Sequence, residues 1–404
     1  MDYKKLYSDT ANSIKASAIR ELLKVISRPE VISLAGGLPD PTLFPIEAVA
    51  KSMQEALATS AREALQYGTT EGQAGLKREL IKLLKETEDI DATAEQLLVV
   101  SASQQGLDMT SRIFLNRGDA IVTSSPTYLG ALQAFEASGA DVYGADSDEQ
   151  GVVPAAIEKR LQELQVAGRP CKFIYLVPDF QNPNGLTIPE SRRVEILKLA
   201  EKYNTLIVED SPYRQVRFEG TAPKTFYHLD EGRGNVITLF TFSKVFVPGF
   251  RLGYVLAPAE VIRKYVILKQ AMDLCTSPIV QVAAEAYLKS GHLQGHIQEV
   301  VKVYHKKRDL MLKVLAEEMP QGVSWTKPEG GLFLWVTLPE YIDAQEMLKI
   351  SLQECVAYVA GVDFYPPRDA KKNDLRLNFS YSTEEQIVEG VKRLARTIKK
   401  AMAK

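Results

Sequence analysis

The sequence predicts an α/β protein with a large domain built on a mainly parallel sheet and a smaller α+β domain. Three observations support this class. From about residue 46 to residue 290, short runs rich in valine and isoleucine alternate with amphipathic stretches, as in strands joined by helices. The runs are apolar almost throughout, which is typical of strands covered on both faces. With 404 residues, the chain is also long for a single core.

The expected elements divide the chain into three parts. Residues 1–45 form an N-terminal arm that belongs with the small domain, with a helix at 17–26 and an irregular Gly/Pro-rich segment at 34–45. The large domain, 46–290, contains the candidate strands 96–101, 120–125, 141–145, 172–177, 206–210, 236–242 and 254–257. The small C-terminal domain, 291–404, is predicted to contain helices at 290–317, 343–355 and from 383, with strands at 333–339 and 375–380.

Composition narrows the possible partners. A formal net charge of -2 gives no reason to expect nucleic acid or an anionic membrane. No apolar run approaches the roughly 18 residues that a spanning helix needs, and the first residues lack the apolar core of a signal peptide. Three widely spaced cysteines are typical of a reducing compartment. We therefore expect a cytoplasmic protein with no membrane or nucleic-acid partner.

The segment TFSKVFVPGFRLG (241–253) follows a predicted strand and places a lysine among groups that suit a phosphate. Lys244 can form an imine with an aldehyde when part of it is unprotonated, and burial and the nearby Arg251 both lower the pKa of an amine. Thr241, Ser243 and the guanidinium fork of Arg251 suit a phosphate dianion. The alternative, a surface turn with a solvated lysine, fits this order of hydroxyls, Pro-Gly and arginine less well.

An aldehyde that also carries a phosphate would fit this segment, as pyridoxal 5'-phosphate (PLP) does. Two further segments could provide partners for the ring of such a cofactor. Asp210 ends the strand before SPY, where a buried carboxylate needs a cation such as a protonated pyridine nitrogen. Tyr213, at the end of VEDSPY (208–213), and Asn182, in PDFQNPNG (178–185), can donate to the phenolic oxygen of the ring. An N-cap aspartate and an ordinary Asn-Pro turn remain the alternatives. The Asn182–Pro183 bond is a candidate cis peptide.

Two other positions complete the predicted site. In SASQQGLDM (101–109), Ser103, Gln104 and the amides of a helix N-terminus can hold phosphate, although a capping serine explains the pattern equally simply. Tyr128 follows the next strand and can stack on a flat ring. Arg376 stands in an otherwise apolar strand and needs an anionic partner if it is buried, either a substrate α-carboxylate or an internal acid.

Together and in this order, these segments resemble the fold-type-I PLP-dependent aminotransferases of class I/II. The likeness is greatest to the subgroup of 2-aminoadipate, kynurenine and aromatic aminotransferases. Nine segments carry the resemblance across nearly the whole chain: SAIRELLKV, SLAGGLPDPTLFP, LQYGTTEGQAGLK, SASQQGLD, PDFQNPNG, VEDSPY, TFSKVFVPGFRLGY, PEGGLFLWV and LRLNFS.

The resemblance implies a role for each matching residue. Lys244 would be the Schiff-base lysine and then the base of the 1,3-proton shift. Asp210 would pair with the pyridine nitrogen, and Tyr128 would stack on the ring. Asn182 and Tyr213 would face the ring oxygen. The residues implied to hold the phosphate are Ser103, Gln104, Thr241, Ser243 and Arg251.

For the substrate, the resemblance implies that Arg376 binds the α-carboxylate and that Gly37, Asn182 and Arg20 contact the amino acid. Arg20 is either a movable arginine for a side-chain carboxylate or a plain solvated residue. Tyr67 matches a tyrosine that reaches the phosphate of the partner subunit, which implies a homodimer with shared active sites.

The implied activity is a ping-pong transfer of the amino group from an aromatic, 2-aminoadipate or branched-chain donor to 2-oxoglutarate. A PLP-dependent C–S lyase of the same fold shares these residues and is the alternative. A PLP-binding regulator would carry a DNA-binding extension, whereas the family-like region here begins by about residue 11. Pro366 and Pro367 stiffen a loop that is often glycine-rich in relatives, so the donor stays open.

No metal site is expected. His292 and His296 are spaced i, i+4 on a predicted helix, but the segment lacks the glutamate and the third ligand of a zinc protease. We interpret them, and the pair Lys306 and Lys307, as part of a solvated face.

Overall fold

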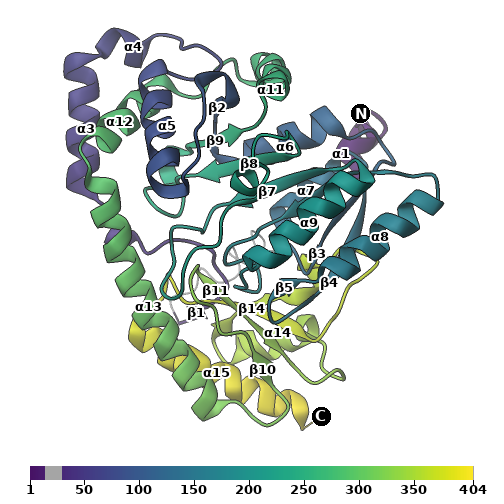
Figure 1. The fold of residues 1–404 in the computed structure, drawn as a ribbon. Helices are drawn as coiled ribbons and strands as arrows, with labels where there is room; N and C mark the ends of the chain where they lie inside the picture. The colour runs from purple at the N-terminus through teal and green to yellow at the C-terminus, as the bar shows by residue number, and fades with distance from the viewer. Residues whose placement is uncertain (14–29, 404) are drawn as a thin grey trace.

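The computed structural model describes residues 1–13 and 30–403, and its larger part is an eight-stranded sheet covered by helices (Figure 1). The strand order is β2-β9-β8-β7-β6-β3-β4-β5. The strands are β2 (Leu97–Val100), β3 (Ala120–Ser125), β4 (Asp141–Asp148), β5 (Gly151–Val152), β6 (Cys171–Leu176), β7 (Leu206–Ser211), β8 (Val236–Thr241) and β9 (Gly253–Leu256).

The sheet is mainly parallel, as predicted. The adjacent pairs from β4 through β3, β6 and β7 to β8 are all parallel, while β9 runs antiparallel to β8 and β2, and β5 antiparallel to β4. No long helix separates β8 from β9, so the chain turns back and pairs antiparallel. The strands β2, β3, β6, β7 and β8 therefore end at the same edge of the sheet.

Alternate side chains of the central strands β3, β6 and β7 enter two separate cores. In β6, Phe173 and Tyr175 pack with Phe135 on one face, whereas Ile174 and Leu176 belong to the core on the other face. This burial on both sides explains the nearly continuous apolar runs. In Figure 1, α8 and α9 lie on one face of the sheet, and α6 and α7 on the other. The helices that pack around this sheet are α6 (Ala102–Phe114), α7 (Leu129–Ala137), α8 (Pro154–Val166), α9 (Glu190–Tyr203), α10 (Phe226–Leu229) and α11 (Ala259–Met272).

A group of helices beside the sheet comes from both ends of this region, with α12 packed against α3, α4 and α5 (Figure 1). Their bounds are α3 (Ile46–Thr59), α4 (Ala61–Leu65), α5 (Ala74–Glu88) and α12 (Pro278–Lys289). The short helices are α1 (Asp9–Ser13) and the 3-10 turns η1 (Tyr3–Lys5), η2 (Pro41–Leu43), η3 (Ala94–Gln96), η4 (Pro248–Phe250) and η5 (Gly361–Phe364).

The smaller part of the structure is an antiparallel sheet with the order β10-β11-β14-β13, packed with α13, α14 and α15. β1 pairs in parallel with β12, so Ile32 and Ser33 join this part although they precede the large domain in sequence. The domain boundaries at residues 45 and 290 stay predictions. The bounds are β1 (Ile32–Ser33), β10 (Ser324–Trp325), β11 (Phe333–Thr337), β12 (Val356–Ala357), β13 (Val359–Ala360), β14 (Asp374–Asn378), α13 (His292–Glu318), α14 (Ala344–Gln353) and α15 (Glu384–Met402).

Two positions on α13 correct the prediction of a solvated face. His296 and Lys307 are buried, in the same stripe of the helix as Val300, Tyr304 and Met311. Lys307 tolerates burial because its Nζ donates to Oδ2 of Asp40 at 2.7 Å, and buried lysines are normally paired. The helical spacing of these positions indicates the inner face of α13. The prediction missed it because Lys307 stands next to another lysine, Lys306, and the pair was interpreted as solvated.

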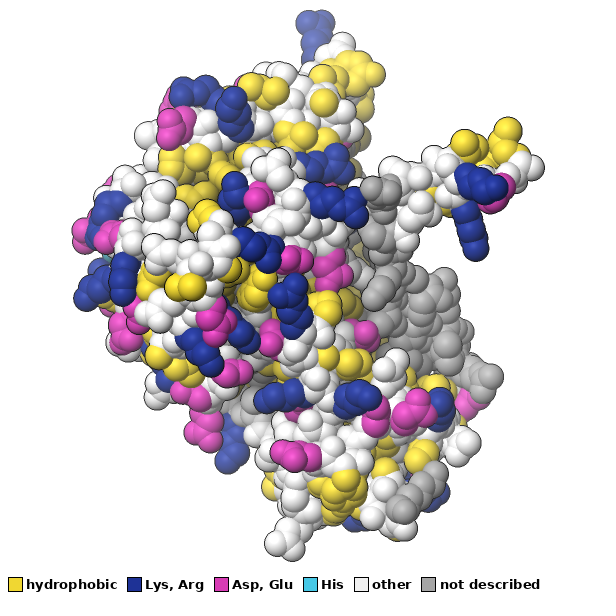
Figure 2. All heavy atoms as spheres, turned by 90° about the vertical axis from the view of Figure 1, so that its right-hand side faces the viewer, with side chains coloured by type: hydrophobic (Ala, Val, Ile, Leu, Met, Phe, Trp, Pro, Cys, Tyr) yellow, Lys and Arg dark blue, Asp and Glu magenta, His cyan; other side chains and the backbone are white. Residues whose placement is uncertain are grey.

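The expected helix at 17–26 lies outside the described residues. Among the helices that are described, none combines the length and the apolar character needed to cross a membrane. On the face drawn in Figure 2, basic and acidic side chains are interspersed.

Candidate active site

A cavity of about 750 Å³ lies at the edge where β2, β3, β6, β7 and β8 end. Ligands of open α/β sheets bind at this edge. Twelve of the predicted site residues line the cavity: Gly37, Ser103, Gln104, Tyr128, Asn182, Asp210, Tyr213, Thr241, Ser243, Lys244, Arg251 and Arg376. The sequence motifs thus converge because successive parallel strands deliver them to one place.

Lys244 enters the cavity from the loop after β8. Its half-buried side chain donates from Nζ to the carbonyl oxygen of Gly37 at 2.9 Å, and Nζ lies 6.0 Å from the centre of the Tyr213 ring. Burial, together with the positive charges of Arg376 and Arg251, lowers the pKa of Lys244 to about 8. At pH 7 about a tenth of this amine is neutral. The interpretation as a solvated surface lysine is therefore wrong.

Asp210 lies inside β7, which continues to Ser211, and no helix starts beside it, so it is not an N-cap. Its Oδ2 accepts a hydrogen bond from the Tyr175 hydroxyl at 2.9 Å. Its Oδ1 is buried without a hydrogen-bond partner. Burial raises the pKa of Asp210 to about 7, against the hydrogen bond from Tyr175. A cationic N–H at Oδ1 would satisfy this oxygen and restore the ionised form.

Asn182 and Tyr213 meet between β6 and β7. The Asn182–Pro183 peptide bond is cis, as predicted. Burial raises the pKa of Tyr213, which keeps the phenol neutral and able to donate, while a hydrogen bond from Asn182 acts in the opposite direction. The Oδ1 of Asn182 accepts from Arg376 at 2.8 Å. Asn182 therefore links the two cavity walls formed by β6 and β14.

The groups predicted for phosphate form the wall at the N-terminus of α6. Ser243 Oγ accepts from Thr241 Oγ1 at 3.0 Å and from Arg251 at 3.3 Å. Ser103 and Gln104 lie in the first turn of α6, whose N-cap Ser101 makes no side-chain cap, so the helix amides stay available to an anion. Tyr128 donates to Gln104 at 3.3 Å. Hydroxyls, a guanidinium and helix amides thus share one wall.

Arg376 is 1% exposed and is held at the centre of β14. Its guanidinium donates to Asn182 and, at 2.7 Å, to the carbonyl oxygen of Ala35, and it lies 4.2 Å from the centre of the Phe333 ring. Its Nε has no hydrogen-bond partner. Burial lowers the pKa of Arg376 to about 10. Within residues 1–13 and 30–403, no acidic side chain pairs with it, so the internal ion pair has no support.

The structure does not bring the last two predicted residues into this cavity, each for a different reason. Tyr67 is 80% exposed and does not line it. Arg20 lies outside the described residues. Conversely, sequence reasoning missed Tyr175 and Phe333. Both were signalled only weakly, Tyr175 as an ordinary apolar-run residue and Phe333 within the motif PEGGLFLWV.

The residues present fit PLP. One cavity combines a neutralisable amine, a buried carboxylate oxygen without a partner, two donors for a ring oxygen and an anion-binding wall. The fold and this site together define a PLP-dependent enzyme of fold type I.

The chain belongs to the family described as aminotransferase class I and II, which it matches over residues 29–394. It is 47% identical to aromatic-amino-acid aminotransferase 1 of Thermococcus litoralis, over 100% of this chain and 96% of the relative. It is 36% identical to the 2-aminoadipate transaminase of Thermus thermophilus, over 100% of this chain and 99% of the relative.

Solved structures agree with this assignment. The multiple substrate aminotransferase from Thermococcus profundus superposes with a TM-score of 0.96 at 45% identity, covering 100% of both chains. The kynurenine aminotransferase from Pyrococcus horikoshii, solved with PMP, gives 0.95 at 45% identity, covering 99% of this chain and 98% of that one. The protein is therefore a PLP-dependent aminotransferase of the subgroup that the sequence indicated, and the C–S lyase alternative is not favoured.

Proposed function

We propose that this aminotransferase moves the amino group of an aromatic, 2-aminoadipate or branched-chain donor to 2-oxoglutarate in a ping-pong reaction. The names of the relatives support the aromatic and 2-aminoadipate part of this range, since they mention aromatic amino acids, 2-aminoadipate and kynurenine. The apolar side chains of Leu38, Leu129 and Phe333 in the cavity lining also suit a donor with an apolar side chain.

The observation that carries the proposal is that Lys244 and Asp210 line the same cavity. When bound, PLP supplies an aldehyde that takes up the amino group and a ring that withdraws electrons from the α-carbon. Lys244 Nζ, with its pKa of about 8, is close enough to neutral to bind that aldehyde. Asp210 Oδ1, buried without a partner, holds the ring nitrogen in its protonated form.

The remaining residues orient the cofactor. Asn182 and Tyr213 donate to the ring oxygen, and Tyr128 stacks on the ring. Five residues with hydroxyl, amide or guanidinium groups hold the phosphate: Ser103, Gln104, Thr241, Ser243 and Arg251.

Arg376 binds the α-carboxylate of the amino acid through its guanidinium fork, which has no acidic partner among the described residues. Gly37 and Asn182 line the same side of the cavity. Lys244 Nζ, in the same cavity, would accept the proton that leaves the α-carbon. In this proposal Arg20 accepts a side-chain carboxylate, which would allow an acidic and an apolar substrate to share one site.

We also propose that the enzyme is a homodimer with shared active sites. Tyr67 supports this, because an exposed tyrosine that does not line its own cavity is free to enter that of a second subunit.

A half-reaction tests the activity. Donor amino acid mixed with the PLP enzyme, in the absence of an acceptor, is expected to yield pyridoxamine phosphate and the 2-oxo acid in equal amounts. Release of pyruvate and ammonia from a β-substituted donor, with PLP retained, would contradict transamination. A donor panel against 2-oxoglutarate, with wild type and Arg20→Ala compared, then identifies the donor class. An equal response of acidic and apolar substrates to Arg20→Ala would contradict the role given to Arg20.

A further inference from the structure

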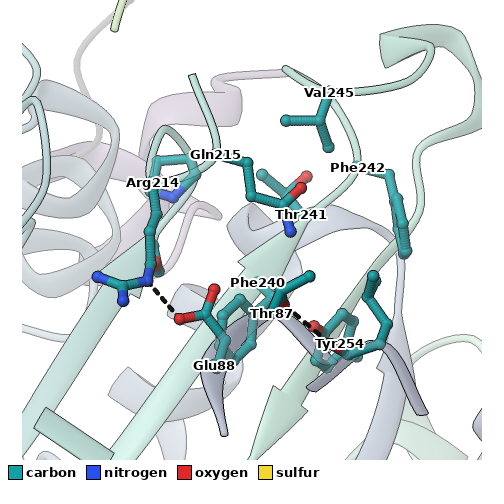
Figure 3. A pocket seen from close by; sticks show the side chains of 12 residues that line it. Thr87, Glu88, Arg214, Gln215, Phe240, Thr241, Phe242, Val245 and Tyr254 are labelled. Carbon is teal, nitrogen blue, oxygen red and sulfur yellow. Dashed lines mark hydrogen bonds and ion pairs between the residues drawn. The ribbon is translucent and has the colours of Figure 1, made fainter. Parts of the chain in front are cut away.

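A buried cluster of charges lies behind the cavity wall, and none of its members lines the cavity. The carboxylate of Asp179 accepts hydrogen bonds from Arg193 at 2.9 Å, from Arg214 at 3.2 Å and from Arg217 at 3.3 Å. Arg214 also donates to Glu88, at the end of α5. Figure 3 shows this second ion pair at one side of a small cavity of about 30 Å³, which Thr241 also lines.

We propose that Asp179 is a positioning residue, which acts through its three arginines to hold Asn182 and Tyr213 against the ring oxygen of the cofactor. The inference rests on the proposed function of those two donors. Asp179 itself does not reach the cofactor site.

The first loop held by the cluster is 178–188, which carries Asn182. Arg193 donates to the carbonyl oxygens of Pro178 and Ile188, at the two ends of this loop, as well as to Asp179. The loop contains a strained residue, since Phe180 has a φ of 49° and is fully buried. A bulky side chain rarely adopts this left-handed conformation unless its surroundings impose it. The guanidinium of Arg217, 4.5 Å from the centre of the Phe180 ring, is part of those surroundings.

The second loop follows β7 and carries Tyr213. Arg214 is the next residue, and its guanidinium is held between Glu88 and Asp179. The amide of Val216 donates to the carbonyl oxygen of Tyr213 at 2.7 Å, which closes a tight turn over residues 213–216. Arg214 lies in this turn and Arg217 directly follows it. Because both bind Asp179, we infer that Asp179 fixes the direction in which Tyr213 points.

The third loop, 328–333, comes from the smaller part of the structure. Its Gly331 amide donates to Val216 at 2.8 Å. A Cβ on Gly330 would lie 2.4 Å from Phe180 and from the carbonyl oxygen of Val216, so only glycine fits between the other two loops. The loop leads to Phe333, which packs edge-on against Tyr213 and under Arg376. One carboxylate therefore lies where three functional loops meet.

The charge of Asp179 is what holds this arrangement. Burial opposes its ionisation, but the charges of Arg193, Arg214 and Arg217 outweigh burial and lower the pKa of Asp179. An asparagine of the same shape would leave three guanidinium groups around a neutral amide. Arg214 and Arg217 would then repel each other, since burial lowers the pKa of Arg217 and the charge of Arg214 lowers it further. We expect the two loops to separate at this point.

The test is the pH titration of the visible absorbance of the bound cofactor in Asp179→Asn. Hydrogen bonds to the ring oxygen favour its anionic form, so their weakening is expected to raise the midpoint by about one pH unit. The control is Asp230→Asn, another buried aspartate, which accepts from Gly234 and Asn235 and does not line the cavity. The midpoint of the absorbance titration of Asp230→Asn is expected to match that of wild type, even if this variant loses as much thermal stability as Asp179→Asn.

A second variant covers the case in which Asp179→Asn does not fold. Glu88→Gln keeps Asp179 and removes only the other partner of Arg214. Burial already raises the pKa of Glu88, so a neutral side chain should be tolerated. The midpoint of the absorbance titration should rise in Glu88→Gln as well, by less than in Asp179→Asn. A wild-type midpoint in Glu88→Gln, or in a folded Asp179→Asn, overturns the inference. Failure of the wild-type enzyme to bind PLP and transaminate would instead overturn the proposed function.

Discussion

Replacement of Arg376 by lysine is expected to weaken binding of every amino-acid substrate. The substitution keeps a positive charge but removes the planar fork that can grip a carboxylate with two parallel hydrogen bonds. In the structure the fork is already oriented by Asn182 at 2.8 Å and by Ala35 at 2.7 Å. A lysine ammonium cannot keep both of these contacts and also bind the α-carboxylate in the same geometry.

The size of the effect follows from the bonds lost. One hydrogen bond to a charged group contributes about 1.5 to 3 kcal/mol. A net loss of about 2 to 3 kcal/mol corresponds to a rise of about 30- to 150-fold in KM, at about 1.4 kcal/mol for each factor of ten. The contact is made in the ground state and in the transition state alike, so kcat should change less than KM.

The assay is steady-state kinetics with a panel of aromatic, acidic and branched-chain donors. Arg192→Lys is a matched control, because Arg192 makes a similar paired contact with Asp148 outside the cavity. Its KM values should stay within about twofold of wild type, as for most substitutions away from a site. A defect of Arg376→Lys confined to one donor would refute the role in binding the α-carboxylate, because that group is common to all donors.

Three further predictions concern the residues proposed to bind the cofactor. Lys244→Ala should remove the visible absorbance of the bound cofactor and nearly all turnover, and retention of both would overturn the assignment of Lys244. Without cofactor, the raised pKa of Asp210, about 7 against an ordinary 3.8, should make the folded protein lose stability as the pH rises from about 4 to about 7, by up to about 4 kcal/mol. Urea unfolding should show this loss for wild type and not for Asp210→Asn, and parallel pH profiles would contradict it. Tyr67→Phe should weaken PLP binding about tenfold through the loss of one hydrogen bond, as measured by equilibrium dialysis, and unchanged affinity would argue against its contact with a partner's phosphate.

The strands were predictable because their burial leaves a local signal. Inner strands of the central sheet such as β6 and β8 are buried on both faces, so their sequences are largely apolar, and the predicted runs lie within a few residues of the observed ones. The antiparallel direction of β9 was not predictable in this way, although its position was predicted. Its antiparallel course depends on a connection from β8 without a long helix, and apolar character alone does not give direction.

The site residues were predictable to the extent that they follow strands. Lys244, Asp210 and Asn182 lie after or at the ends of three neighbouring parallel strands, so topology alone brings them together. Tyr175 could not be identified, because its hydroxyl reaches Asp210 from within a strand whose other residues are simply apolar. The cluster around Asp179 was equally hidden, since its partners are separated by more than a hundred positions in the case of Glu88 and Arg214.

Sequence reasoning also left the partner of Arg376 open between a substrate and an internal acid, and the structure separates these alternatives through the atoms that remain unpaired. Native proteins pair nearly all of their buried polar atoms, yet Asp210 Oδ1 and Arg376 Nε, both facing this site, have no partner. The cavity also brings together the cations Lys244 and Arg376, and no acidic side chain among the described residues pairs with Arg376. Such a site is costly when it is empty and is stabilised by any ligand that supplies a cation at one end and a carboxylate at the other. Cofactor and substrate should therefore raise the midpoint of thermal unfolding together, and by more than either alone.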